Sequence, residues 1–142
     1  METNKTIVSR RVAELLSIKG FDEATQNYYV DKLRLTSKRT FNRVKHNRIP
    51  SHYAAPTIDE LVSWLKDKHN IICRSSIDFE NILNNSSEKS FKPHIEKDGH
   101  IVIGTDWKYD NYNYLELYYS KEEDCYNEMF RYILNKFIPN VY

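Results

Sequence analysis

The 142-residue chain has few of the residues that form loops, cross-links or membrane spans. Its 3 glycines and 4 prolines are too few for a low-complexity protein, and its 2 cysteines are too few for a disulfide framework. No apolar run approaches the roughly 20 residues of a membrane-spanning helix. Residues 1–6 also lack the apolar core of a secretory signal. These absences predict a cytoplasmic protein with no membrane contact.

Catalytic and metal-binding motifs are absent as well. The 3 glycines stand at positions 20, 99 and 104, so no glycine-rich phosphate loop can form, and there is no Gly-x-Ser-x-Gly or His-Glu-x-x-His motif. His69 and Cys73 straddle an expected helix end, whereas a closed zinc site takes four ligands. Cys125 has acidic neighbours, which do not favour a reactive thiolate. We predict no catalytic residue, metal or cofactor, although a pocket assembled from distant residues would leave no motif.

The residues that are present are typical of a folded domain. Hydrophobic residues make up 40% of the chain and charged residues 29%, which are ordinary globular values. A chain of this length can bury about two thirds of its unfolded surface in one core. We therefore predict a single domain over residues 1–142.

The apolar spacing and the helix-capping residues predict four helical segments. An apolar stripe over residues 7–18 is followed by Gly20, which favours a helix end. Asp22 can cap a second short helix over residues 23–30. Capping boxes predict two further helix starts, which stand at Thr57 with Glu60 and at Ser120 with Glu123. These last two helices are expected to end near His69 and before Pro139.

Between the last two helices the pattern changes to that of strands. Apolar and polar residues alternate from Ile71 to Glu80, and two further runs, 91–97 and 100–107, flank the hairpin signal Asp98-Gly99. Pro93 cannot donate a ladder hydrogen bond, so the strand over 91–97 is expected at a sheet edge. Residues 114–119 are predicted to form a further strand.

These segments together predict an α+β fold in the order α-α-α-β-β-β-α. An antiparallel sheet of three to four strands is flanked by helices. Residues 1–31 supply the N-terminal helical segments, residues 32–56 an irregular or partly helical basic connection, and residues 57–142 the α-β-β-β-α core.

Charge is divided unevenly along the chain. Residues 1–56 carry a net charge of +6, from 11 basic and 5 acidic residues, although the whole chain carries only +1. The segment 32–48 is basic, holds no acid and includes Phe41 and His46, a composition suited to phosphate contacts. The candidate nucleic-acid-binding residues are Lys38, Arg39, Arg43, Lys45 and Arg48. The alternative is a solvated face, or a patch paired with the protein's own carboxylates.

Tyrosine is in excess, with 11 residues, and it is concentrated between positions 107 and 119. Tyrosine rings separated by Asn and Asp are typical of binding loops, because they give large contact area at low entropic cost. The candidate partner-binding residues are Trp107, Tyr109, Tyr112 and Tyr114. The alternative is a half-buried strand, in which tyrosine is also common. The leading hypothesis is protein binding through these residues, and nucleic-acid binding through the basic segment is the alternative.

Two resemblances bear on these hypotheses. The α-β-β-β-α order is similar to that of double-stranded-RNA-binding domains, but Glu122, Glu123 and Asp124 stand where such domains place lysines on phosphates, so that function is not transferred.

Three further segments resemble small uncharacterised proteins of phages and integrated elements of Bacteroides-type gut bacteria. They are Val12-Ala-Glu-Leu-Leu16 with Gly20-Phe21-Asp22, then Ala55 to Leu65 with His69-Asn-Ile71, and Tyr119-Ser-Lys-Glu-Glu123. The sequence departs from that group over residues 124–130, where bulky residues replace the usual alanines. The resemblance implies an accessory protein of a mobile element and supplies no activity.

Overall fold

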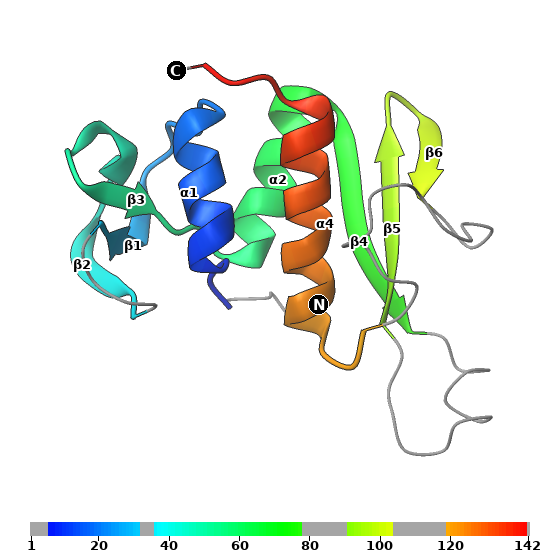
Figure 1. Cartoon of the computed structure of the whole chain (residues 1–142), viewed down its shortest axis with the longest axis horizontal. Helices are drawn as coiled ribbons and strands as arrows, with labels where there is room; N and C mark the ends of the chain where they lie inside the picture. Colours follow the sequence, from blue (N-terminus) through cyan, green and yellow to red (C-terminus); the bar gives the residue numbers. More distant parts are fainter. Residues whose placement is uncertain (1–5, 32–35, 78–90, 104–118, 142) are drawn as a thin grey trace. The chain divides into compact units, whose positions relative to one another are not determined.

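A computed structural model describes residues 6–31, 36–77, 91–103 and 119–141 (Figure 1). In chain order the elements are α1 (Arg10–Ile18), β1 (Thr25–Val30), β2 (Lys38–Val44), the 3-10 helix η1 (His46–Arg48), β3 (His52–Ala54), α2 (Ile58–His69), β4 (Ile71–Ile77), β5 (Phe91–Lys97), β6 (His100–Ile103) and α4 (Glu122–Phe137). The predicted α+β class is confirmed. The predicted order is wrong in detail, because the described residues form two antiparallel sheets of three strands each.

The chain divides into two compact units. The first consists of Met1–Glu60 and Ile133–Tyr142, and the second of Leu61–Tyr132. None of the helices within the described ranges is long and apolar enough to cross a bilayer.

In the first unit, α1 contacts β1 and β3 of a sheet with the strand order β2-β1-β3. The Ser9 hydroxyl caps α1 by accepting a hydrogen bond from the Val12 amide at 3.3 Å. Tyr29 Oη donates to the Val8 carbonyl oxygen at 2.8 Å, which satisfies the polar end of this buried ring. The buried apolar side chains of this unit are Val8, Val12, Ala13, Leu16, Phe21, Tyr29, Ala54, Ala55, Ile58, Ile133, Leu134 and Ile138.

The helix predicted over residues 23–30 is wrong, because residues 25–30 form strand β1. The Asp22 carboxylate does not cap a helix. It accepts hydrogen bonds from Arg48 Nε at 2.8 Å and Arg48 Nη2 at 2.6 Å, and so binds a residue 26 positions away. Thr25, Tyr28, Tyr29 and Val30 also belong to the residue types that favour strands.

The irregular or partly helical basic connection predicted over residues 32–56 is wrong for the two strands that it contains, although residues 46–48 are helical. The described part of this connection contains β2, η1 and β3, and both strands pair with β1 in antiparallel fashion. Lys38, Arg39 and Arg43 therefore belong to a sheet with a defined register, whereas Lys45 and Arg48 lie at η1.

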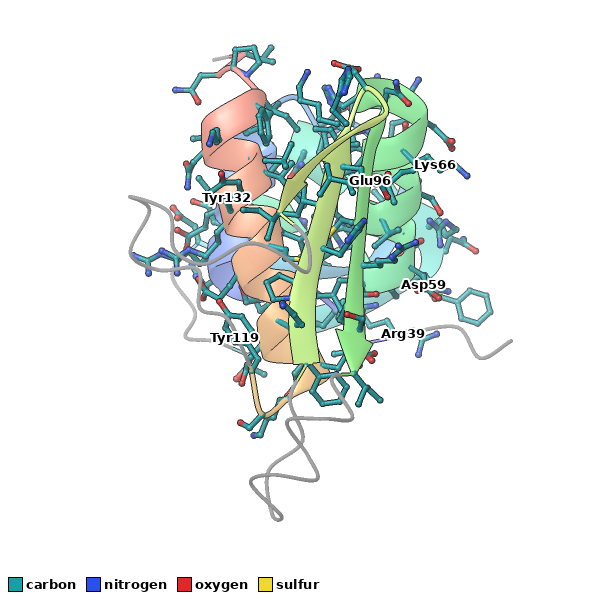
Figure 2. The ribbon with its side chains drawn as sticks, turned by 90° about the vertical axis from the view of Figure 1, so that its right-hand side faces the viewer. Arg39, Asp59, Lys66, Glu96, Tyr119 and Tyr132 are labelled. Carbon is teal, nitrogen blue, oxygen red and sulfur yellow. The ribbon has the colours of Figure 1, made fainter. Side chains whose placement is uncertain are left out.

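The second unit contains the sheet β4-β5-β6 together with residues of α2 and α4. In Figure 2 this sheet, with Glu96 of β5 labelled, lies in front of both helices. Ile71 and Cys73 are buried while Ile72 and Arg74 are exposed, which confirms the predicted alternation over residues 71–74, but Ile77, predicted on the buried side, is exposed. The buried apolar side chains of this unit are Leu61, Trp64, Leu65, Ile71, Cys73, Ile95, Ile103, Tyr119, Cys125, Met129, Phe130 and Tyr132.

One of the two predicted capping boxes is present. The Thr57 amide donates to Glu60 Oε1 at 2.8 Å, and the Glu60 amide donates to Thr57 Oγ1 at 3.2 Å, so two otherwise orphan amides at the start of α2 are satisfied. The helix ends at His69, as predicted. The box predicted at Ser120 is wrong by one position, since α4 begins at Glu122 and Lys121 precedes it. The predicted end of α4 before Pro139 is confirmed.

The predicted hairpin forms at Asp98 and Gly99, which both have positive φ, at 52° and 83°. Lys97 pairs with His100 as expected.

The prediction that Pro93 places its strand at an edge is wrong, because β5 is the central strand. Phe91 bonds to Tyr119 on the side away from β4, and Pro93, two residues on, turns its nitrogen the same way. The missing N–H therefore does not interrupt the β4–β5 ladder. The strand expected at 114–118 and the extension of β6 to Trp107 lie outside the described residues.

Candidate nucleic-acid interface

Strand β2 carries a large bulge. Thr25 pairs with Val44 and Asn27 pairs with Arg39, so Gln26 alone faces the four residues 40–43. Extra residues on one strand bend it and can redirect a side chain. Here the bulge (residues 40–43) presents Phe41 with 95% of its side chain exposed.

Gln26 fixes the shape of the bulge through three hydrogen bonds. Its Nε2 donates to the Phe41 carbonyl oxygen at 3.4 Å, and its Oε1 accepts from Arg39 Nη2 at 3.0 Å. Its own carbonyl oxygen accepts from Thr40 Oγ1 at 3.1 Å. Arg43 Nη2 adds a bond to the Ala24 carbonyl oxygen at 2.6 Å. The bulge is therefore tied at one end to Gln26 of β1 and at the other to Ala24, which directly precedes β1.

The five predicted cations lie within residues 38–48, which we call the basic segment. In the structure three of these cations pair with carboxylates. Arg43 forms an ion pair with Glu60, and Arg48 and Lys45 share Asp22, at 2.6 Å and 3.8 Å. Hydrogen bonds and charge from Arg48, with a smaller contribution from Lys45, hold the pKa of Asp22 below its usual value. Among the described residues, no carboxylate pairs with Lys38 or Arg39.

Three rings form a cluster next to the bulge. Tyr28 stacks on His46 and on His52, with a centroid distance of 4.3 Å in each case, and the two imidazoles are 5.4 Å apart. Two imidazoles stacked on opposite faces of the Tyr28 ring would be further apart than 5.4 Å, so both lie on the same face of that ring. His46 is buried, at 1% exposure, and sequence reasoning treated it only as part of the basic surface.

The two imidazoles are linked by a single shared hydrogen. His46 Nδ1 and His52 Nδ1 are 3.2 Å apart, so one nitrogen must donate and the other accept. His46 Nε2 lies 3.3 Å from Thr40 Oγ1, and the Thr40 hydroxyl can donate to the Asn42 carbonyl oxygen at 2.7 Å. These distances fit an arrangement in which neutral His46 donates its Nε2 hydrogen to Thr40 Oγ1 and its Nδ1 accepts from His52, while the one Thr40 hydroxyl hydrogen is shared between the Gln26 and Asn42 carbonyl oxygens. Burial, reinforced by the charge of His52, lowers the pKa of His46.

We expect stability to depend on pH through His46. In the unfolded chain His46 takes up a proton near its ordinary value of about 6.5. In the folded chain its pKa is lower, so the unfolded state binds more protons at acidic pH. The contribution is therefore complete above about pH 6.5 and is lost as the pH falls toward the folded pKa.

Urea denaturation at a series of pH values checks this expectation. His69, whose pKa burial also lowers, acts in the same direction, so wild type must be compared with His46→Gln. The variant should show a smaller loss of unfolding free energy between neutral and mildly acidic pH. Identical pH profiles for the two proteins would contradict the assignment to His46.

The structure describes the basic segment but not the other candidate surface. Trp107, Tyr109, Tyr112 and Tyr114 lie outside the described residues. No group of three or more His, Cys, Asp or Glu side chains in the described part could hold a metal ion. Cys125 is fully buried, and burial, followed by the charge of Glu122, raises its pKa to about 12, which agrees with the prediction that it is not a reactive thiolate.

Comparison with known proteins gives no relative on which a role could be based. No family model, curated protein or solved structure matches the chain. The resemblance to mobile-element proteins therefore stays a prediction.

Proposed function

We propose that this chain is a non-catalytic accessory protein that binds another macromolecule, and that its basic segment contacts nucleic acid. The observation that supports this proposal is a local excess of positive charge. Within the described ranges neither Lys38 nor Arg39 has a carboxylate partner, and Lys45 and Arg48 share Asp22, so part of the positive charge of the segment is not balanced by ion pairs. Exposed ion pairs contribute only about 0–1 kcal/mol, so phosphates can also compete for Arg43, Lys45 and Arg48.

Binding to a phosphate backbone has a salt signature. Each neutralised phosphate releases counterions, and three contacts give a slope of log K against log salt of about −2 to −3. Affinity should then fall roughly 15- to 60-fold between about 50 and 200 mM salt. Fluorescence anisotropy with a labelled oligonucleotide measures this slope.

A matched pair of charge variants locates the contact. Lys38→Gln with Arg39→Gln removes the two cations that lack carboxylate partners, and should weaken binding and reduce the slope by roughly 1.5. Lys66→Gln with Lys68→Gln removes the same charge from α2, where Figure 2 shows Lys66, and should leave the affinity nearly unchanged. Failure of the wild-type protein to bind DNA or RNA at about 50 mM salt would exclude the proposal.

Protein binding through Trp107, Tyr109, Tyr112 and Tyr114 is a second proposal, and the excess of 11 tyrosines supports it. Affinity purification after nuclease treatment compares the wild type with a variant in which Ser replaces the three tyrosines. Loss of a captured protein from an otherwise folded variant supports this surface. Unchanged capture would remove it from consideration.

A further inference from the structure

We infer that the nucleic acid bound by the basic segment is single-stranded, and that one unpaired base stacks on the ring of Phe41. The inference rests on the proposed function and specifies its ligand. It is carried by one observation. The bulge exposes the Phe41 ring to water close in sequence to Lys38 and Arg39, which pair with no carboxylate of the described residues.

Phe41 is exposed in a way that few large apolar side chains are. Its side chain is 95% exposed, compared with 67% for Ile101 and 60% for Val141. Within the described ranges it is also the one aromatic among the exposed large hydrophobic side chains. A ring held in this position leaves its face free for a planar partner.

The backbone around Phe41 is fixed rather than free, because Gln26 binds the Phe41 carbonyl oxygen and also holds Arg39 and Thr40. The entropic cost of ordering the contact is therefore partly met before the ligand arrives. The four residues of the bulge face one residue of β1, and this mismatch projects the ring away from the sheet.

The charges near the Phe41 ring indicate which kind of ligand binds there. Lys38 and Arg39 precede Phe41 and Arg43 follows it, and an extended segment from 38 to 43 spans at most about 17 Å. An aromatic ring among cations matches a polyanion whose bases are exposed, since base–aromatic stacking and phosphate contacts then act together. Duplex DNA or RNA keeps its base faces stacked inside the helix and cannot use the ring in this way. A neutral apolar pocket on a protein would leave Lys38 and Arg39, which pair with no carboxylate of the described residues, without a counter-charge.

Binding of a short mixed-sequence DNA strand, the matching RNA strand and the duplex of the same sequence tests the inference at about 50 mM salt. We expect the single strands to bind more tightly than the duplex. Phe41→Ala should weaken single-strand binding by roughly 5- to 150-fold with an unchanged salt slope, and should not affect the duplex. Phe41→Leu should behave like Phe41→Ala, because it keeps the apolar volume and removes the stacking face. Phe41→Trp should keep the binding of the wild type, and its added fluorescence should be quenched when the strand binds.

Ile101→Ala is the matched control, since it truncates another exposed apolar side chain far from the basic segment in sequence. It should bind as the wild type does. Because Phe41 is almost fully exposed, the thermal midpoint of Phe41→Ala should equal that of the wild type, which confirms that the variant is folded.

The outcomes separate this inference from the proposed function. Equal affinity for strand and duplex, or wild-type affinity in Phe41→Ala, would overturn the stacking contact while the charge variants could still support nucleic-acid binding. Absence of any binding would overturn both.

Discussion

Gly20→Ala is expected to lower the free energy of unfolding by about 1.5–3 kcal/mol, through backbone strain and a steric clash. Gly20 follows the end of α1 with φ at +86°, in the left-handed region that disfavours a Cβ atom. An added Cβ would also lie 2.8 Å from Val141 Cγ2. The Phe21 amide donates to the Leu16 carbonyl oxygen at 3.2 Å, which is the Schellman bond that this conformation permits.

Two comparisons separate the strain from the clash in urea denaturation. Gly99 has nearly the same φ, at +83°, but an added Cβ meets nothing within 4 Å, so Gly99→Ala should cost only about 1 kcal/mol. Shortening the neighbour in Gly20→Ala/Val141→Ala should recover the difference. Equal losses for Gly20→Ala and Gly99→Ala would show that the C-terminal segment does not lie against the end of α1.

Leu16→Ala is expected to have the largest effect on stability, at about 2–5 kcal/mol. Leu16 is 0% exposed, so truncation removes buried apolar contacts and leaves a cavity. Ile18, two residues further along α1, is 38% exposed, and Ile18→Ala should cost less than about 1 kcal/mol. Chemical denaturation of both variants measures the contrast. Similar losses at the two positions would contradict the burial of this face of α1.

Features with local causes could be predicted from the sequence. The capping box of Thr57 and Glu60 and the Asp98-Gly99 turn depend on residues within four positions of one another, and both are confirmed. The α1 stripe is similarly local. In the second unit, the described elements keep the predicted α-β-β-β-α order.

Features with distant causes could not be predicted. Asp22 has the chemistry of a helix cap, but Arg48 binds its carboxylate, and β1 pairs with two strands that follow it. The bulge hides the period of β2, since four residues face one and the alternation is lost. Long-range pairing therefore overrode a correct local rule in the first 56 residues.

The same division applies to the candidate site. Its cations and Phe41 were visible in the sequence, because composition alone identifies a basic segment with an aromatic residue. The role of Gln26 was not visible, since it depends on register across the sheet. The contact of His46 with His52 arises because η1 and β3 bring the two rings onto Tyr28, and no spacing rule signals it.

Backbone amide chemical shifts of the isotopically labelled protein, recorded while a short single-stranded DNA is added, test the nucleic-acid surface most directly. The expected perturbations are concentrated in residues 38–48 and at Gln26, and they disappear as salt is raised. Perturbations confined to other parts of the chain, such as residues 107–119, or no perturbation at about 50 mM salt, would contradict the assignment.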